Sequence, residues 1–331
     1  MPRRQFAHKA GGGKTTRAIS GRGEQGAEPI ESVSRSKQAG RDDAAGDAAR
    51  VTAGLYIVAT PIGHLRDITL RALDVLAGAD VVACEDTRVT EKLMSRYGLA
   101  GQRLAYHEHN AERMRPLLIE KLKAGAVVAL VSDAGTPLIS DPGFKLVRAA
   151  IAEGITVTTL PGASAALAAL VLSGLPPDRF FFQGFLPPKE AARRRVLGEI
   201  ATLHATLIIY ETGPRLAATL ADMAEVLGDR PAAVARELTK LYEELHRGGL
   251  AGLAAHYAAA GAPKGEIVIV VGGVDEAAAR AALSAADLDA ALDAALATMS
   301  VKDASAAVAD ATGRPRREVY QRALILAGRG E

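Results

Sequence analysis

The sequence predicts an α/β fold with two domains, because short apolar runs alternate with helical patterns along most of the chain. The first run covers residues 55–59, a helical pattern follows over 68–76, and the last apolar run ends at residue 271. A Pro-containing break at residues 174–177 interrupts this rhythm. We therefore expect one α/β domain over residues 53–174 and a second over residues 175–274.

Composition narrows the class of protein. Hydrophobic residues make up 49% of the 331 residues and aromatics only 4%, so Ala, Leu and Val must build the core. Because the net charge is only +2, any basic surface for nucleic acid must be local. The single cysteine, Cys84, excludes an intramolecular disulfide framework and a cysteine-based metal cluster, and it indicates a reducing, cytoplasmic compartment.

The apolar runs and the N-terminal segment bear on where in the cell the protein is located. No apolar run approaches the ~20 residues of a membrane span, and the N-terminus does not resemble a signal peptide, so we expect no membrane insertion. Residues 1–52 are rich in Gly, Ala, Ser, Arg and Lys, which predicts a disordered extension. Gly13-Lys14-Thr15 matches the end of a P-loop, but His8 stands where its first Gly belongs. A transit peptide, a loose RNA-binding arm and a solvated tail all remain open.

The first domain begins with the strand at 55–59, after which Thr60-Pro61-Ile62-Gly63 turns the chain. Asp67 stands at the N-cap position of the helix over 68–76. The strand over 80–84 then ends in Glu85-Asp86-Thr87-Arg88, four polar residues at the carboxyl end of a strand. These residues are either part of a site or a helix cap with solvated charges.

The next polar stretch, Tyr106-His107-Glu108-His109-Asn110, carries two histidines and a carboxylate. Their spacing suits one face of a strand, but no third ligand is evident and a zinc site needs three or four. We therefore expect no metal, and assign the stretch to substrate contact or capping. A helix over 112–123 and a buried strand over 126–131 follow.

The loop over residues 130–143 is the main site candidate of the chain. It holds two Gly, two Pro, two Asp and two Ser, and ligands in open α/β sheets bind beyond the carboxyl ends of strands. Asp133 offers a carboxylate and Gly135 allows close approach of backbone to a ligand. An ordinary connection is the alternative, although most such loops are only about 2–6 residues long.

Small residues mark a second candidate turn. After a helix over 144–152 and a strand over 155–160, Pro161-Gly162-Ala163-Ser164-Ala165 opens a helix that runs to Ser173. The N-terminus of this helix suits an anionic group such as a carboxylate. Plain packing of the helix on a sheet is the alternative.

The second half repeats the α/β pattern and adds a helical tail. Its helix over 190–203 carries a basic cluster, Arg193 to Arg195. Beyond residue 275 the chain has no strand pattern, and helices over 301–311 and 316–326 flank a Gly-containing turn with arginines on the second helix. This tail, residues 275–331, predicts a helix-turn-helix, with a surface hairpin without ligand as the alternative. The other predicted elements are strands over 180–182, 206–210, 232–236 and 266–271 and a helix over 214–227.

Seven motifs occur in order along the chain: Thr60-Pro61-Ile62-Gly63, Glu85-Asp86-Thr87-Arg88, Tyr106 to Asn110, Ser132 to Pro137, Phe182 to Pro187, Ala235 to Lys240 and Lys264-Gly265-Glu266. Taken together they resemble the tetrapyrrole-methylase superfamily and, within it, the ribosomal RNA small subunit methyltransferase I family. The resemblance covers residues 54–273 and extends to the tail, because this family carries a C-terminal helix-turn-helix-like module. The chain departs from the family pattern in two places: His64 stands where the family usually has Asn, and Tyr210-Glu211 is followed by Thr212-Gly213-Pro214-Arg215 in place of a Ser-Pro-His-Arg run.

The resemblance implies two α/β domains with S-adenosylmethionine in the cleft between them. It implies methylation of the ribose 2′-hydroxyl of a cytidine in 16S ribosomal RNA of the small subunit, by a homodimer. The absence of a G-x-G-x-x-G turn after the first strand fits, because a Rossmann-type enzyme would be expected to show one. Carried onto this chain, the cofactor contacts are Ile62, Asp133, Thr136, Ser164, Ala165, Tyr210, Arg236 and Glu266.

Methyl transfer to a hydroxyl calls for positioning and for a general base. We expect Glu85 or Asp86 to be the base, with His107 as the alternative and Arg88 positioning a phosphate. The expected RNA contacts are the cations Lys189, Arg193, Arg194, Arg195, Arg316 and Arg317.

Two other functions remain compatible with the sequence. A small-molecule methyltransferase acting on a corrinoid or tetrapyrrole shares the fold but would not need the helix-turn-helix tail. A non-enzymatic ribosome-assembly factor that binds RNA would make the cofactor loop incidental.

Overall fold

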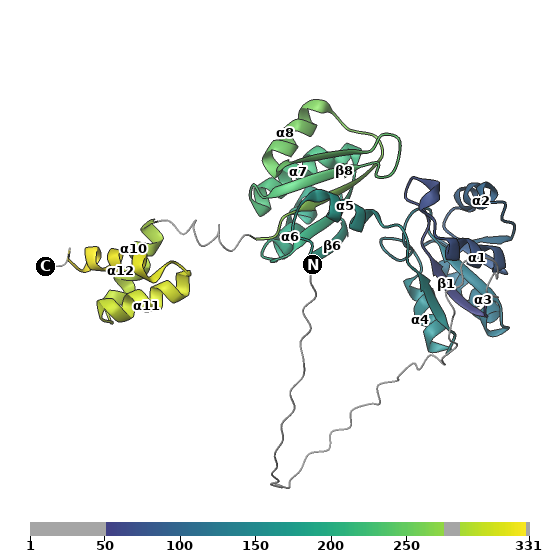
Figure 1. Ribbon diagram of the computed structural model, residues 1–331, viewed down its shortest axis with the longest axis horizontal. Helices are drawn as coiled ribbons and strands as arrows, with labels where there is room; N and C mark the ends of the chain where they lie inside the picture. Colours follow the sequence, from purple (N-terminus) through teal and green to yellow (C-terminus); the bar gives the residue numbers. More distant parts are fainter. Residues whose placement is uncertain (1–50, 275–284, 329–331) are drawn as a thin grey trace, which may run out of the picture. The chain divides into compact units, whose positions relative to one another are not determined.

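The computed structural model describes residues 51–274 and 285–328 of the chain (Figure 1). The predicted disordered extension therefore lies outside the described residues except for Val51 and Thr52. The first ten residues of the predicted tail also lie outside them.

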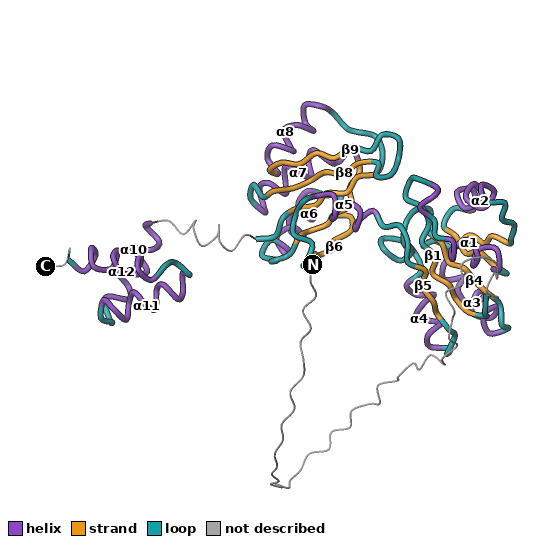
Figure 2. The backbone as a smooth tube through the Cα atoms, in the orientation of Figure 1, coloured by secondary structure: helices purple, strands orange, loops and turns teal. Residues whose placement is uncertain are grey.

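The first domain is a parallel sheet of five strands in the order β3-β2-β4-β1-β5 (Figure 2). The strands β1, β2 and β4 are buried along their whole length, as expected for a parallel sheet covered on both faces. One face packs on side chains of α1 and α2 and the other on α3 and α4. The elements are β1 (Gly54–Val58), α1 (Leu70–Gly78), β2 (Val81–Cys84), α2 (Thr87–Arg96), β3 (Gln102–Ala105), α3 (Ala111–Lys123), β4 (Val127–Val131), α4 (Phe144–Ala152) and β5 (Val157–Leu160).

The second domain is a mixed sheet of five strands in the order β6-β7-β10-β8-β9, in which only β6 and β7 pair in parallel. The helices α6, α7 and α8 cover one face of it. Its elements are β6 (Phe180–Phe185), α6 (Glu190–Ile200), β7 (Thr206–Thr212), α7 (Gly213–Leu227), β8 (Pro231–Arg236), β9 (Glu244–Gly249), α8 (Leu250–Ala260) and β10 (Glu266–Val271).

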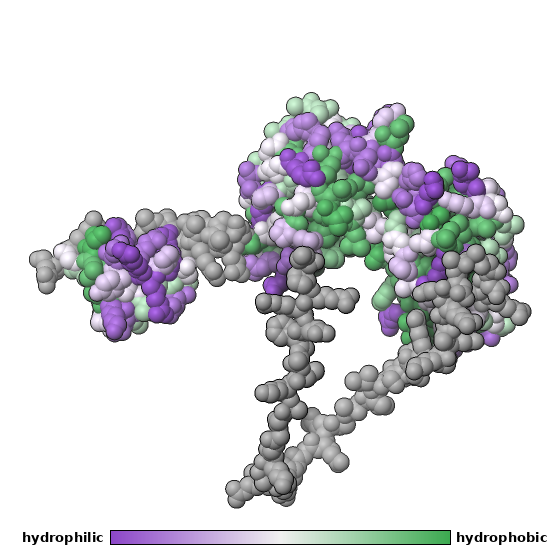
Figure 3. Space-filling model, viewed as in Figure 1, coloured by the Kyte–Doolittle hydropathy of each residue, from purple (hydrophilic) through white to green (hydrophobic). Residues whose placement is uncertain are grey.

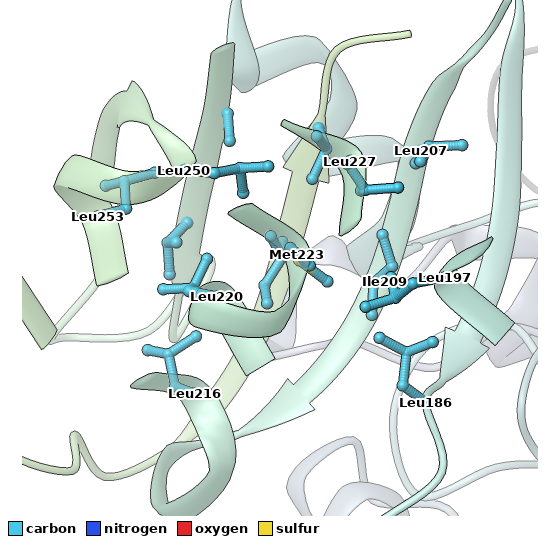
Figure 4. Close-up of a cluster of buried hydrophobic side chains, with 14 of the residues drawn as sticks. Leu186, Leu197, Leu207, Ile209, Leu216, Leu220, Met223, Leu227, Leu250 and Leu253 are labelled. Atoms are coloured by element: carbon cyan, nitrogen blue, oxygen red, sulfur yellow. The ribbon is translucent and has the colours of Figure 1, made fainter. Parts of the chain in front are cut away.

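The largest core lies beneath these three helices. Figure 4 shows Leu220 and Met223 of α7 in one cluster with Leu207 and Ile209 of β7, and all four side chains have no exposed area. Alternate residues of β7 face this core, which is how a strand sends one set of side chains to each face of its sheet.

The opposite face of the second sheet is covered by α5 (Ala165–Ser173), the helix that follows β5 of the first sheet. Ala169 and Leu170 of α5 pack with Val268 and Val270 of β10, and Ile62 joins the same cluster. The chain therefore crosses from one sheet to the other before α5, earlier than the break at residues 174–177 indicates.

The tail folds as three helices around a small core of its own. Leu292, Val308 and Val319, one from each helix, are buried together. Ser300 caps the second helix by accepting a hydrogen bond from the Asp303 N–H at 3.2 Å, and Gly313 ends that helix in the left-handed conformation. The predicted helix-turn-helix is thus confirmed. Its helices are α10 (Ala285–Leu296), α11 (Val301–Thr312) and α12 (Arg316–Ala327).

One predicted cap is wrong. Asp67 belongs to a short 3-10 helix, η1 (Leu65–Asp67), and Thr69 caps α1 instead, accepting a hydrogen bond from the Ala72 N–H at 3.1 Å. Thr is nearly as good a cap as Asp, so two candidates two residues apart could not be separated by sequence. Among the described residues, no helix combines the length and apolar character needed to cross a membrane.

Candidate functional site

The site forms where the carboxyl ends of three neighbouring strands meet. The strand β1 lies between β4 and β5 and is parallel to both, so the loops that follow all three begin at one edge of the sheet. The N–H of Thr60 donates to the Gly135 carbonyl at 2.9 Å, and the N–H of Gly135 donates to the Thr60 carbonyl at 3.0 Å. The hydroxyl of Thr136 donates to the Ala163 carbonyl at 3.1 Å and ties in the third loop.

The loop after β4, predicted above as the main site candidate, carries backbone strain. Gly135 has a φ of +80°, and a Cβ there would lie 3.3 Å from the Ile62 side chain. Leu138 and Ser140 also have positive φ values, 74° and 66°, although neither is glycine. Each such residue costs about 1–3 kcal/mol, and such strain persists only where surrounding contacts fix the backbone, often at functional sites.

A pocket of about 300 Å³ opens at this edge and is lined from both sheets. This volume is at the lower end of the range for small-molecule sites. The second domain contributes aromatic surface: Tyr210 makes edge-to-face contacts with Phe182 and Phe185, at 5.0 and 5.6 Å between ring centres. The residues that line the pocket are Ile62, Asp133 to Thr136, Ile139 to Asp141, Ser164, Ala165, Phe185, Tyr210 to Thr212, Ala235, Leu238 and Gly265 to Val268.

Seven of the eight residues predicted to bind a cofactor line this pocket. They are Ile62, Asp133, Thr136, Ser164, Ala165, Tyr210 and Glu266. Arg236 is the exception, because its neighbour Ala235 lines the pocket while successive side chains of a strand point to opposite faces. The Arg236 guanidinium pairs instead with Glu244 at 2.8 Å and donates to the Lys264 carbonyl at 3.0 Å.

Asp141 is a pocket residue that sequence reasoning did not single out. Burial, and then the negative charge of Glu85, raise the pKa of its carboxyl to about 6. Burial also raises the pKa of Glu85 and of Asp133, and each is further raised by a neighbouring carboxylate. Asp133 accepts a hydrogen bond from the Asp86 N–H at 3.0 Å, which connects the loop after β2 to the pocket. Asp133 and Asp141, which line the pocket, thus lie close to the carboxylate of Glu85.

Asp86 has the capping role that the sequence left as an alternative. Its carboxylate accepts the Arg88 N–H at 2.8 Å and pairs with the Arg88 guanidinium at 2.6 Å. These hydrogen bonds from Arg88 lower the pKa of Asp86 to about 2, so Asp86 is a weak base. None of the four residues predicted to be catalytic, Glu85, Asp86, Arg88 and His107, lines the pocket itself.

The two histidines lie in the turn just before α3. The N–H of His107 donates to the Asn110 side chain at 2.9 Å, and the Asn110 amide donates to the Ala105 carbonyl at 2.9 Å, which fixes the turn before α3. The His107 Nδ1 is buried without a hydrogen-bond partner among the described residues, and its charge lowers the pKa of nearby Glu85. In the described part of the chain, no three His, Cys, Asp or Glu side chains are grouped to hold a metal ion.

The predicted RNA contact at Arg193 is wrong. Its side chain is only 6% exposed, because it forms a buried ion pair with Asp222, to which its Nε donates at 2.6 Å. Arg194 also pairs with Asp222, at 2.8 Å, and with Glu225 at 2.6 Å. Both guanidinium groups are therefore engaged in joining α6 to α7.

The other predicted RNA contacts remain accessible. The side chain of Arg195 is 76% exposed, with Glu199 3.9 Å away. Arg316 is 72% exposed and lies 3.1 Å from Asp310, and Arg317 is exposed on the same helix. Lys189 occupies the N-cap position of α6 and is also exposed.

Comparison with known proteins identifies the family. Residues 54–254 match the family model of Tetrapyrrole (Corrin/Porphyrin) Methylases, and residues 276–327 match the RsmI C-terminal HTH domain. The chain is 52% identical over 273 residues to a Ribosomal RNA small subunit methyltransferase I from Mesorhizobium japonicum, covering 82% of this chain and 92% of that protein. The chain belongs to the ribosomal RNA small subunit methyltransferase I family. The resemblance predicted from the seven motifs is confirmed.

A second family member agrees with this assignment, and a solved structure shares the fold. A Ribosomal RNA small subunit methyltransferase I from Erythrobacter litoralis is 53% identical, over 82% of this chain and 95% of that protein. The crystal structure of a diphthine synthase matches with a TM-score of 0.52 and 19% identity, over 66% of this chain and 89% of that one. At that identity the structural likeness shows the shared fold.

The buried pair between Arg193 and Asp222 leads to a prediction about stability. Arg193→Ala should lower the free energy of unfolding by about 3 kcal/mol, the lower end for breaking a buried pair, because Arg194 still pairs with Asp222. Arg195→Ala removes an exposed charge from the same helix and should change it by less than about 1 kcal/mol. Urea unfolding of both variants measures the difference, and equal losses would contradict the structural role of Arg193.

Proposed function

We propose that this protein transfers a methyl group from S-adenosylmethionine to the ribose 2′-hydroxyl of a cytidine in small-subunit (16S) ribosomal RNA. The observation that carries the proposal is the strained, carboxylate-bearing pocket, lined by seven residues at the family's cofactor positions. It occurs in a chain about half identical to Ribosomal RNA small subunit methyltransferase I proteins over nearly their full length.

The pocket fits an amphipathic, positively charged cofactor. Ile62, Leu238 and Val268 provide apolar walls, while Asp133 and Glu266 provide carboxylates for cationic groups. Ser164 caps α5 at the pocket, so the N-terminus of this nine-residue helix faces the site and suits a carboxylate. When bound, S-adenosylmethionine supplies an activated methyl group on a sulfonium and leaves as a neutral thioether.

Asp141 is the general base of this proposal. It lines the pocket, and its pKa of about 6 leaves the carboxylate ionised at neutral pH yet able to take up a proton. In this role one Asp141 oxygen accepts the proton of the ribose hydroxyl. Glu85 acts as the neighbour whose charge tunes Asp141, and His107, beside Glu85, stays the alternative base.

Arg88 remains a candidate for phosphate contact. Its side chain is 86% exposed and is held in place by Asp86, so it can meet a phosphate without first being ordered. The other accessible positive charges that we propose to contact the RNA are those of Lys189, Arg195, Arg316 and Arg317. Arg193 and Arg194 are not part of it, because their guanidinium groups are already paired with acids of α7.

We also propose that the protein acts as a cytoplasmic homodimer. The outer face of α5 exposes Leu167 and Val171, which are 51% and 74% exposed and one helical turn apart. Hydrophobic residues gather on this face of the second domain, over α5 and β6 (Figure 3). Exposed apolar surface of this kind supports association of two copies.

Methylation of the small subunit is the primary test. Small ribosomal subunits from cells that lack this gene should incorporate labelled methyl groups, and mapping should find one 2′-O-methylcytidine in 16S RNA. Large subunits, the matched control, should incorporate none. No incorporation into small subunits, together with tight cofactor binding by calorimetry, would contradict the proposed substrate.

The base assignment predicts a pH dependence. The rate should fall as the pH drops below about 6, because protonated Asp141 cannot accept the hydroxyl proton. Asp141→Asn should lower kcat by about 10²–10⁴-fold without weakening cofactor binding. Glu85→Gln should move the acidic limb to lower pH, since it removes a charge that raises the pKa of Asp141. An unchanged profile in Asp141→Asn would exclude it as the base.

The homodimer is checked by sedimentation equilibrium. The wild-type protein should have twice the mass of one chain, and Val171→Asp should shift it toward the monomer by placing a charge in the apolar contact. Leu70→Asp, at an apolar residue that is 81% exposed on α1, is the control and should leave the mass unchanged. A monomeric wild-type protein would rule out this assembly.

A further inference from the structure

A second hollow lies next to the pocket and has no role in the function described so far. Its volume is about 710 Å³, and it is formed by the loop before η1, η1 itself, the end of α2 and the loop after β8. We call it the basic groove. It is lined by Gly63, His64, Leu65, Arg66, Arg96, Tyr97, Thr239, Lys240 and Leu241.

The groove and the pocket share one wall of backbone. Ile62 lines the pocket and the next residue, Gly63, lines the groove. Likewise, Leu238 lines the pocket and the next residue, Thr239, lines the groove. A Cβ at Gly63 would lie 2.6 Å from the Thr239 hydroxyl and 2.9 Å from the Leu238 carbonyl. The His64 N–H donates to that hydroxyl at 3.0 Å. Whatever occupies the groove is therefore separated from the pocket by a single layer of chain.

Two cations without an acidic partner among the described residues line this groove. Within residues 51–274 and 285–328, no carboxylate lies within 4.0 Å of the guanidinium of Arg66 or Arg96, and both side chains are exposed. Many other arginines there pair with acids, as Arg103 does with Glu91. Lys240 adds a third cation, but Glu237 and Glu266 lie 2.8 and 3.2 Å from it. The groove thus has positive charge available for an anionic ligand.

The groove also offers apolar and aromatic surface. The Tyr97 hydroxyl donates to the Leu65 carbonyl at 2.6 Å, which fixes its ring in the wall. Leu241 is 88% exposed, and the adjacent Tyr242 is 68% exposed. Cations that follow a backbone, together with rings on which bases stack, are typical of sites for single-stranded nucleic acid.

We propose that the basic groove holds the single-stranded RNA segment next to the target nucleotide. Arg66 and Arg96 contact its phosphates, and Leu241 and Tyr242 pack against a neighbouring base. This inference rests on the proposed function, since it concerns how the same substrate reaches the pocket. His64, at which this chain departs from the family pattern, lies in the wall of the same groove.

The test compares two double variants that lose the same charge. Arg66→Ala with Arg96→Ala should weaken binding of a fluorescent single-stranded RNA oligonucleotide on the order of tenfold and lower the salt slope by about 1.4. The control, Arg113→Ala with Arg148→Ala, removes exposed cations of α3 and α4 and should keep the wild-type slope. Tyr242→Ala should weaken RNA binding without changing the slope, because stacking releases no counterions.

We call the double variant Arg66→Ala with Arg96→Ala the groove variant. Its affinity for S-adenosylmethionine, measured by calorimetry, and its urea unfolding should equal those of the wild type, and this result would show that the pocket and the fold are intact. On small subunits its KM should rise while kcat stays near the wild-type value. A wild-type salt slope and KM in the groove variant, with a wild-type enzyme that methylates small subunits, would overturn the groove and leave the function standing. RNA binding that depends on Arg66 and Arg96 without any methylation would instead support the groove and remove the proposed reaction.

Discussion

Two backbone hydrogen bonds between Thr60 and Gly135 are the constraint on which the site depends. They join the loop after β1 to the loop after β4, which start side by side because the two strands are parallel neighbours. The bridge requires a positive φ at Gly135 and a close approach to Ile62, so a side chain at this position would disturb both. Ile62 and Asp133 take their positions in the pocket wall from this bridge.

Acidic side chains of the pocket and basic side chains of the groove lie on opposite sides of a single layer of chain. Asp133 and Asp141 lie in the pocket, where burial raises the pKa of both carboxyls, while Arg66 and Arg96 lie in the groove with no acid of the described residues beside them. A proton acceptor that works near neutral pH needs partial burial, whereas a polyanion needs solvent-facing cations. Placing the two environments back to back allows an anionic substrate to approach an acidic pocket.

The candidate site could be predicted only in part. The loop over residues 130–143 stood out by its length and composition, and Asp133 followed from it, while Ser164 followed from the turn of small residues over 161–165. Ile62, Tyr210 and Glu266 came from family motifs, because nothing in their local pattern indicates a ligand. Asp141 was missed since its burial arises from tertiary packing. Arg193 was misjudged for the same reason: its partner Asp222 lies 29 residues away, and a run of three arginines gives no sign of it.

By itself the sequence determined the order of most helices and strands, the helix-turn-helix tail and the family, because periodicity, caps and motifs are local properties. The tertiary structure decided that polar β3 and β9 form sheet edges, where no alternation of apolar residues is required. It also decided that α5 covers the second sheet and which charges are buried. Burial and pKa depend on residues far apart in the chain, and a local pattern does not contain that information.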